Sequence, residues 1–278
     1  MVSEIEGLVK KGVTEFVLTG IHLSSYGLDF SEDGMKITDY KAALNEEINL
    51  LTLIQKVHEI EGVKRLRIGS LEPRIMTEEF ARTLASLPKV CPHFHLALQS
   101  GAKETLKRMN RHYTPEDYRA AVENLRAVYD RPANTTDVIT GFPGETEEEF
   151  EESKRFFTET GFFEPNIFPY SRRRGTVADK MKNQVPDAVK KARTDVMLRL
   201  GEESSKAYSE SLVGKETEVL SETQVPAEKV PEEVKKSLTG TVYSGHTREF
   251  LTVYMSAESP NEVRTGVIRK AGPYYVVE

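Results

Sequence analysis

Residues 93–111 read HFHLALQSGAKETLKRMNR, and their spacing changes from strand-like to helix-like at the centre of the stretch. In the first half, Phe94, Leu96 and Leu98 occupy one face of a strand, and the residues between them, ending in Gln99, occupy the other. The second half has helical spacing and is rich in lysine and arginine. A strand that leads directly into a helix is the repeating unit of α/β folds.

The same alternation continues on both sides of this stretch. Strands are predicted at residues 15–20, 65–71, 93–99, 135–141 and 165–170. Helices are predicted at residues 49–61, 77–87 and 102–109, after Pro115, and at 146–160. Strands that alternate with helices form parallel sheets, so the sequence predicts an α/β domain built as a partial (β/α) barrel.

The pattern changes in the last quarter of the chain. Residues 186–211 form one long polar helix, and short strands separated by glycine, proline and polar turns follow. This predicts two domains, 1–211 and 212–278, of which the second is a small all-β module without helices. The charged, proline-containing residues 225–236 are predicted to form an exposed loop of that module.

The composition limits the chemistry of the chain. No apolar run approaches the roughly 18 residues that cross a bilayer, and the charged N-terminus is no secretory signal, so a cytoplasmic protein is expected. The only cysteine, Cys91, excludes an internal disulfide and a cysteine-ligated cluster made by this chain alone. The net charge of -6 is not that of a protein that coats nucleic acid, although a local basic patch remains compatible with it.

Polar residues gather where the predicted strands end, which is where α/β folds bind ligands. Those that follow from this position are Gly20, Glu72, Gln99, Ser100, Asp137, Gly141, Tyr170 and Ser171. A buried amide such as that of Gln99 needs a partner, because leaving it unpaired costs about 1–3 kcal/mol. Glu72 has two interpretations: it binds a ligand ammonium group, or it pairs with Arg74.

Two further loops also lie at strand ends. Residues 138–150, VITGFPGETEEEF, combine glycines for a tight turn with a capping box of Thr146 and Glu149, which suits either a ligand loop or an ordinary strand–helix turn. It lacks the lysine of a P-loop. Arg172, Arg173 and Arg174 follow the fifth strand and are predicted either to contact phosphate or to form a solvated loop.

A metal site is a weaker interpretation of the segment CPHFH. Cys91, His93 and His95 alternate on one strand face, but such histidines are more often hydrogen-bonded core residues, and no metal is expected.

The β module could bind RNA, as small β-barrels often do. Its acidic residues outnumber its basic ones, so binding would use a local face made of Arg248, Phe250, Arg264, Arg269 and Tyr274.

Four segments in this order resemble the methylthiotransferase family of radical S-adenosylmethionine enzymes: LTGIHLSSYG, HFHLALQSGAKETLKRMNR, DVITGFPGETEEEF and FPYSRRRGT. LTGIHLSSYG and CPHFHLALQSG favour the branch that acts on threonylcarbamoyladenosine in tRNA over the isopentenyladenosine and ribosomal-protein branches. The C-terminal module resembles the family's RNA-binding TRAM domain, and the resemblance covers nearly the whole chain.

The resemblance implies roles for individual residues toward S-adenosylmethionine. Glu72 would accept from the ammonium group, Gln99 and Arg111 would hold the carboxylate or ribose side, and Asp137 would bind a ribose hydroxyl. The remaining cofactor contacts would come from Gly20, Ile21, Ser100, Phe168 and Tyr170, and the RNA contacts from Arg172, Arg173, Arg174, Arg248 and Arg269. The implied partners are tRNA and a reductant such as flavodoxin or ferredoxin.

The family binds 4Fe–4S clusters through an N-terminal domain and a CxxxCxxC loop, and this sequence contains neither. The resemblance therefore implies a chain that starts after the cluster loop and is inactive alone. The alternative is a non-catalytic fragment that binds RNA and nucleotides.

Overall fold

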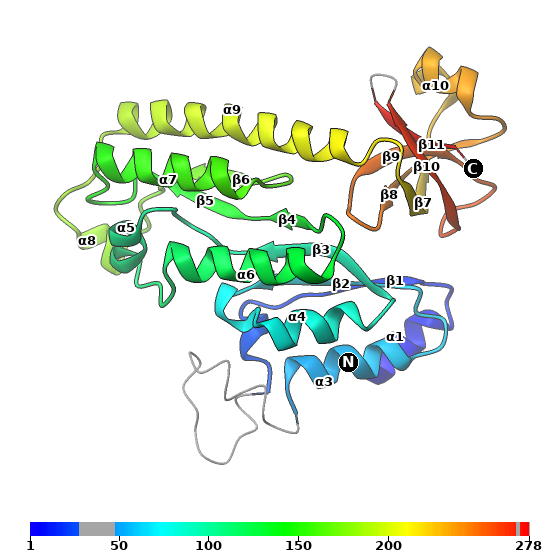
Figure 1. Cartoon of the computed structure of the whole chain (residues 1–278), viewed down its shortest axis with the longest axis horizontal. Helices are drawn as coiled ribbons and strands as arrows, with labels where there is room; N and C mark the ends of the chain where they lie inside the picture. The colour runs from blue at the N-terminus through cyan, green and yellow to red at the C-terminus, as the bar shows by residue number, and fades with distance from the viewer. Residues whose placement is uncertain (28–47, 271–272, 278) are drawn as a thin grey trace.

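The computed structural model describes residues 1–27, 48–270 and 273–277, which form a half-barrel of parallel strands followed by a small closed β-barrel (Figure 1). The half-barrel strands are β1 (Glu15–Leu18), β2 (Arg65–Leu71), β3 (Val90–Leu96), β4 (Ala133–Thr135), β5 (Asp137–Thr140) and β6 (Asn166–Pro169). All neighbouring pairs are parallel, in the order β1-β2-β3-β4 and then β5-β6. The predicted partial barrel of parallel strands is confirmed.

Two strands differ from their predicted bounds at the point where the sheet turns a corner. The third strand ends at Leu96 and not at Gln99, and the fourth is interrupted at Thr136. The Thr136 hydroxyl accepts from the Leu98 amide and donates to the Leu96 carbonyl, so a side chain replaces the backbone ladder there. An isolated bridge between Gln99 and Val138 then joins the two parts of the sheet. Spacing alone does not reveal a hydroxyl that substitutes for a backbone partner.

The helices lie on one face of this sheet, and α3, α4, α6, α7 and α9 follow one another across it (Figure 1). Their bounds are α1 (Val2–Val9), α3 (Leu50–Glu59), α4 (Glu78–Ala85), α5 (Lys103–Arg108), α6 (Pro115–Val128), α7 (Glu147–Thr160), α8 (Val177–Lys180) and α9 (Asp187–Ser211), with 3-10 turns η1 (Leu23–Ser25) and η3 (Pro73–Ile75). Side-chain caps at Asn49, Thr114 and Thr146 fix three of the helix starts. Phe94, Leu96 and Leu98 are fully buried in the core beneath the helices, so the opposite face of β3 faces the lumen.

The C-terminal module is a closed barrel of five strands. These are β7 (Glu216–Gln224), β8 (Val242–Thr247), β9 (Thr252–Ser256), β10 (Val263–Lys270) and β11 (Tyr274–Val277). The expectation of a helix-free module with an exposed loop at 225–236 is wrong. A 3-10 turn η4 (Ala227–Lys229) and a helix α10 (Glu232–Ser237) occupy that segment, and Val230 and Val234 are buried in a small core of their own. Val230 ends the 3-10 turn, and Val234 is the one buried residue of a helix whose other side chains are mostly charged, so hydrophobic spacing did not indicate it.

The β module docks at the amino ends of the half-barrel strands. Arg65 and Arg67, both fully buried in β2, share the carboxylate of Glu15 and donate to the carbonyls of the β8–β9 turn. Four such bonds, of 2.7–2.9 Å, reach the carbonyls of residues 246–248. Phe250 in the same turn stacks on the His93 ring, with centroids 4.7 Å apart. The turn therefore closes one end of the lumen and leaves the carboxyl ends of the strands open.

No helix among the described residues is long and apolar enough to cross a membrane.

Candidate functional site

Asp137 lies at the centre of the polar lumen of the half-barrel. It is the first residue of β5, and its carboxylate is about one-third exposed. The Nε2 atom of His95, from β3, lies 3.4 Å from one carboxylate oxygen, and the Asn166 amide of β6 donates to the other over 3.1 Å. Three neighbouring segments of the sheet thus contribute one side chain each to the same small cluster.

The electrostatics of this cluster favour an ionised Asp137. The interaction with His95, together with the Asn166 amide and the positive charge of Arg111, holds the pKa of Asp137 below its ordinary value against the opposing effect of burial. Asp137 is therefore a fixed anionic acceptor at neutral pH.

Arg111 and Glu72 reach the same end of the lumen from two loops. Burial raises the pKa of Tyr113, and the charges of Arg111 and Glu72 both act on this phenol. The Tyr113 hydroxyl donates to the carbonyls of Ala97 and Leu98 and so fixes the loop after β3. Among the described residues, no side-chain hydrogen bond or ion pair involves the Arg111 guanidinium, which is exposed.

Glu72 already has a protein partner. Its carboxylate accepts from the Arg74 guanidinium in a bidentate pair, at 2.9 and 3.1 Å. The pairing that the sequence left open is therefore present, and a ligand ammonium group would have to share this carboxylate.

Gln99 occupies a strained backbone position in the loop after β3. Its φ of 65° lies in the left-handed region, which side-chain-bearing residues adopt at a cost. The backbone N–H of Gln99 donates to the backbone carbonyl of Asp137, and the backbone carbonyl of Gln99 accepts from the backbone N–H of Ile139. Gln99 is thus held beside Asp137 through the backbone, and the residue as a whole is buried.

The structure places Ser100, Gly20 and Ile21 differently from one another. Ser100 is fully buried, and its hydroxyl accepts from the Ala102 amide at the start of α5. Gly20 and Ile21 are exposed in the segment after β1, and Ile21 is fully solvent-accessible. Ser100 therefore supports the loop, whereas Gly20 and Ile21 face the open side.

The loop after β5 is braced from the long helix α9. Glu145 accepts from the Gly141 amide and forms a buried ion pair with Arg193 over 2.7 Å. Burial raises the pKa of Glu145 despite these two partners. This internal pairing gives the loop a structural function that its glycines alone did not indicate.

Two aromatic residues follow Asp137 around the sheet. Phe168, in β6, is about half exposed, and Tyr170 packs edge-on against Phe142 with ring centroids 5.3 Å apart. They provide an apolar surface at the open end of the lumen.

The three arginines after β6 are not equivalent. Arg172 is tied to Asp179 by an ion pair of 2.6 Å and by a bond to its carbonyl. Arg173 and Arg174 are exposed, and in the described part of the chain no ion pair involves either of them. Two of the three predicted phosphate contacts are therefore free side chains.

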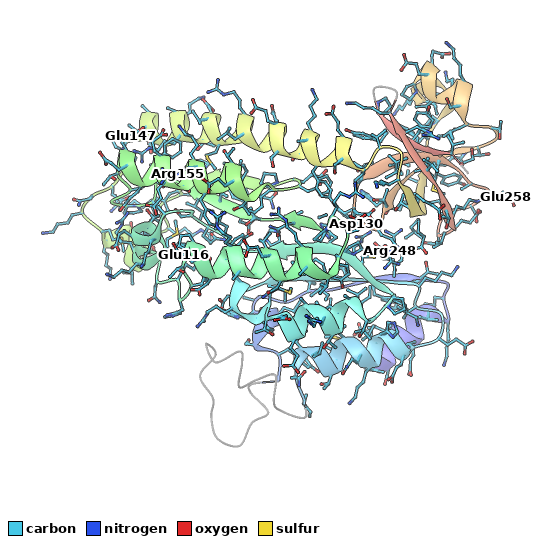
Figure 2. The ribbon with its side chains drawn as sticks, in the orientation of Figure 1. Glu116, Asp130, Glu147, Arg155, Arg248 and Glu258 are labelled. Carbon is cyan, nitrogen blue, oxygen red and sulfur yellow. The ribbon has the colours of Figure 1, made fainter. Side chains whose placement is uncertain are left out.

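Arg248 lies partly buried between the β module and the half-barrel (Figure 2). Its guanidinium donates to the carbonyls of Pro88 and Val90, at 2.6 and 2.8 Å. Arg269 is exposed on β10, and Arg264 pairs with Glu262 over 2.9 Å.

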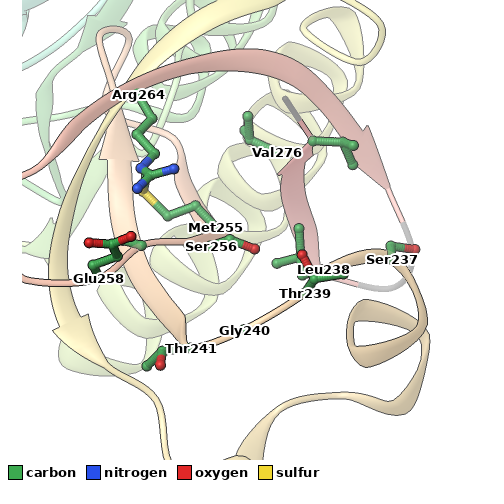
Figure 3. Close-up of a pocket in the computed structure, with 12 residues that line it drawn as sticks. Ser237, Leu238, Thr239, Gly240, Thr241, Met255, Ser256, Glu258, Arg264 and Val276 are labelled. Carbon is green, nitrogen blue, oxygen red and sulfur yellow. The ribbon is translucent and has the colours of Figure 1, made fainter.

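The β module contains a cavity of about 610 Å³. Arg264 and Glu258 line one side of this cavity, and the segment around Thr239 lines the other (Figure 3).

A metal centre is not formed by the described residues, whose histidines, cysteine and carboxylates do not gather in any group of three. Hydrophobic spacing did not indicate the contacts that His95, Asn166 and Thr135 make around Asp137. Their only signal was a polar residue at every second strand position, which also occurs on solvated strands.

The fold and the sequence identify the class of protein. The oxygen-independent coproporphyrinogen III oxidase (HemN) of Escherichia coli, described as a radical SAM enzyme, has a similar fold over 77% of this chain and 51% of its own, with a TM-score of 0.50 and 14% identity. The radical SAM superfamily model matches residues 1–157, more than half of the chain. The chain belongs to the radical SAM superfamily.

The curated proteins to which the chain is similar include enzymes of two names that both act on tRNA. The tRNA-2-methylthio-N(6)-dimethylallyladenosine synthase of Caldicellulosiruptor saccharolyticus is 39% identical over 79% of this chain and 44% of its own length. The threonylcarbamoyladenosine tRNA methylthiotransferase MtaB of Bacillus subtilis is 35% identical over 99% of this chain and 56% of its own. The chain thus spans about half the length of the relatives it matches, and it is similar to both branches of methylthiotransferases.

Proposed function

We propose that this chain is the cofactor-binding half-barrel and RNA-binding module of a tRNA methylthiotransferase that acts on threonylcarbamoyladenosine. The observation that carries the proposal is the carboxylate of Asp137, which His95 and Asn166 position inside a radical SAM half-barrel and on which the charge of Arg111 acts. Glu72 and Arg111 follow neighbouring strands in the loops on the same side of the sheet. S-adenosylmethionine presents an ammonium group, a carboxylate, a ribose diol and an adenine, and Glu72, Arg111 and Asp137 offer complementary charge for the first three.

Each of these three residues has a defined task in this proposal. Glu72 accepts from the ammonium group, Arg111 holds the carboxylate with its planar fork, and Asp137 accepts from the ribose. Gln99 helps to hold the carboxylate or ribose side, and Ser100 supports the loop that carries Gln99. Phe168 and Tyr170 line the adenine, while the backbone of Gly20 and Ile21 borders the methionine portion.

When bound beside a reduced 4Fe–4S cluster, the cofactor supplies a 5′-deoxyadenosyl radical in this superfamily. A cluster of that type needs several thiolates, and this chain has only Cys91, which is fully buried. The residues of this chain therefore do not fit the cluster, and their own contribution is to bind and orient the nucleoside and the RNA.

The RNA contacts are proposed for the exposed arginines. Arg173 and Arg174 lie at the open end of the lumen, with Arg172 fixing their loop, and Arg269 lies on the β module. The resemblance implies an RNA contact for Arg248 as well, but its guanidinium is engaged by two backbone carbonyls, so its contribution is to fix the module. The proposal includes tRNA as substrate, a flavodoxin or ferredoxin as reductant, and a cytoplasmic location, where such tRNA is modified.

Two observations favour threonylcarbamoyladenosine as the target. The segments LTGIHLSSYG and CPHFHLALQSG resemble that branch. In addition, the match to the Bacillus subtilis relative extends over 99% of this chain, whereas the dimethylallyladenosine synthase matches 79%. The higher identity of the latter makes dimethylallyladenosine the second candidate.

A pair of chimeras tests the proposal. The N-terminal half of each relative is joined to this chain, and each chimera is expressed in a strain that lacks its own methylthiotransferases. Mass spectrometry of the digested tRNA is expected to detect the methylthio form of threonylcarbamoyladenosine, and an Asp137→Ala chimera serves as the inactive control. If both chimeras instead produce the methylthio form of dimethylallyladenosine, the chain belongs to an enzyme that acts on dimethylallyladenosine. Absence of both products, with tRNA binding retained, would favour a non-catalytic RNA- and nucleotide-binding fragment.

A further inference from the structure

The carboxylate of Asp137 is anchored at both oxygens by different side chains. His95 Nε2 faces one oxygen at 3.4 Å, and the Asn166 amide donates to the other over 3.1 Å. A carboxylate has about four acceptor positions, so each oxygen of Asp137 can still accept a further bond. The side chain is about one-third exposed toward the lumen, where a ligand could supply these bonds.

The orientation of the His95 ring is fixed from its other side. Its Nδ1 atom lies 3.0 Å from the hydroxyl of Thr135, which can donate to that nitrogen. A neutral imidazole has one donor and one acceptor nitrogen, and an ionised Asp137 requires a donor at Nε2. The hydroxyl of Thr135 is therefore matched to the tautomer with its proton on Nε2.

The other charged group near Asp137 is compatible with this arrangement. Arg111 acts on Asp137 through its charge but forms no ion pair with it among the described residues. Asp137 is consequently flanked by His95 and by the Asn166 amide, and no ion pair with Arg111 covers its side facing the lumen among the described residues.

We propose that His95, oriented by Thr135, is a positioning residue that together with Asn166 presents Asp137 as a two-oxygen acceptor for a vicinal diol. This inference rests on the proposed function, in which the lumen binds the nucleoside part of a cofactor, and it adds the residue that determines which nucleosides fit. Both hydroxyls of the ligand donate, one to each oxygen of Asp137.

The geometry distinguishes between two kinds of nucleoside. A free nucleoside or small cofactor has both the 2′- and the 3′-hydroxyl available. A nucleotide inside an RNA strand has its 3′-oxygen in a phosphodiester, which cannot donate and carries a negative charge next to Asp137. The lumen at Asp137 therefore selects the cofactor, and the target nucleotide of the tRNA is excluded from this position.

Calorimetric titration of the chain with four probes tests this selection: adenosine, 2′-deoxyadenosine, 3′-deoxyadenosine and adenosine 3′-monophosphate. Loss of one hydrogen bond to a charged group weakens binding by about 10- to 100-fold. Each of the three modified probes is expected to bind at least about tenfold more weakly than adenosine, in keeping with that range.

Variants separate a positioning role from a structural one. His95→Ala is expected to reduce the preference for adenosine over 2′-deoxyadenosine to about twofold, well below the effect of one charged hydrogen bond. His95→Gln, whose amide can donate, restores part of that preference. Thr135→Val lacks the hydroxyl that orients the His95 ring, and it is also expected to lower the preference for adenosine over 2′-deoxyadenosine. His58→Gln, on the helix-covered side of the sheet in α3, is the matched control and keeps the wild-type ratio. A merely structural role would weaken all four probes equally and leave the ratios unchanged.

Nuclear magnetic resonance supplies a readout that needs no ligand. The ¹⁵N shifts of His95 are expected to be those of the Nε2–H tautomer, and the Asp137 carboxyl is expected to titrate at higher pH in His95→Ala than in the wild type. A proton on Nδ1, or an Asp137 titration that His95→Ala leaves unchanged, would overturn the inference whatever the probes show. Wild-type binding of adenosine with unaltered ratios in the His95 variants would also overturn it while leaving the proposed function intact. If adenosine does not bind even at millimolar concentration, the proposed cofactor site itself is wrong.

Discussion

Among single residues, Arg111 has the most direct consequence for binding. Its guanidinium is exposed at the open end of the lumen and, within the described ranges, has no side-chain hydrogen bond or ion pair. A planar fork of donors without a protein partner suits a carboxylate ligand. The strand-to-helix stretch that contains it thus ends in a side chain available for binding.

Arg111→Ala is expected to weaken binding of S-adenosylhomocysteine by about 1.5–3 kcal/mol, because the variant cannot form a hydrogen-bonded charge pair with the ligand. Isothermal titration calorimetry measures the change. Lys107→Ala removes a charge of the same sign from an exposed side chain of α5 and is expected to have little effect. Equal affinities of the Arg111 variant and the wild type would remove Arg111 from the site.

A second residue-scale prediction concerns His93 and pH. Burial, followed by the charges of Arg67, His95 and His246, lowers the pKa of His93 to about 3. The unfolded chain takes up this proton near pH 6.5, so between about pH 6.5 and 3 the unfolded state binds more protons than the folded one. The stability that depends on neutral His93 is therefore complete above pH 6.5 and is lost as the pH falls.

Between pH 7.5 and 5, His93 alone is expected to lower the free energy of unfolding by about 2 kcal/mol. Urea titrations at several pH values measure this slope. His93→Phe retains a ring that can stack on Phe250 but does not titrate, so its slope should be shallower by that amount. His112→Gln, at an exposed position, should keep the wild-type slope. Identical slopes for the wild type and His93→Phe would contradict the prediction.

At the scale of elements, the loop between β6 and α8 holds one arginine in an ion pair and leaves two exposed. Asp179 accepts from the Gly175 amide and pairs with Arg172. Arg173 and Arg174 are exposed, and no ion pair in the described chain involves either of them. A run of three like charges therefore contains side chains in two different environments, which the sequence alone does not separate.

The double variant Arg173→Ala, Arg174→Ala is expected to weaken tRNA binding and to reduce the slope of log K against log salt by about 1 for each phosphate that is no longer neutralised. Fluorescence anisotropy with labelled tRNA at several salt concentrations measures both. The pair Arg155→Ala, Arg199→Ala removes the same charge from exposed positions on α7 and α9 and serves as control; Arg155 is marked in Figure 2. If both double variants show the same decrease in affinity and slope, net charge and not this loop explains the binding.

The whole molecule is one folded unit because the β module and the half-barrel share buried groups. Ala133 and Phe163 of the half-barrel pack in the core of the β module. Arg65 and Arg67 donate to carbonyls of its β8–β9 turn. Buried guanidinium groups without these acceptors would be left unpaired, so neither unit is complete without the other.

Thermal unfolding is accordingly expected to show one transition when followed by circular dichroism and by tyrosine fluorescence. Arg67→Met removes the donor to the Arg248 carbonyl and one of the two guanidinium partners of Glu15, which keeps Arg65. The variant is expected to cost about 1–3 kcal/mol, the cost of leaving a buried acceptor unpaired. Arg82→Met breaks an exposed pair with Glu78 and should cost less than about 1 kcal/mol. Two separate wild-type transitions, or equal costs for the two variants, would show that the units fold independently.

The sequence by itself determined the alternation of strands and helices and the change to a C-terminal module built mainly of strands, because hydrophobic periodicity is local and directly readable. It did not reveal α10, whose single valine, Val234, lies among charges, or the break at Thr136, where a hydroxyl replaces a backbone partner. Only the tertiary structure decided the partners of the charged residues. Arg248 with Pro88 and Asp137 with His95 are pairings between distant segments, and such pairings depend on the register of the sheet and on where the β module docks. The local pair of Glu72 and Arg74 was one of two interpretations of the sequence, and the structure selected it.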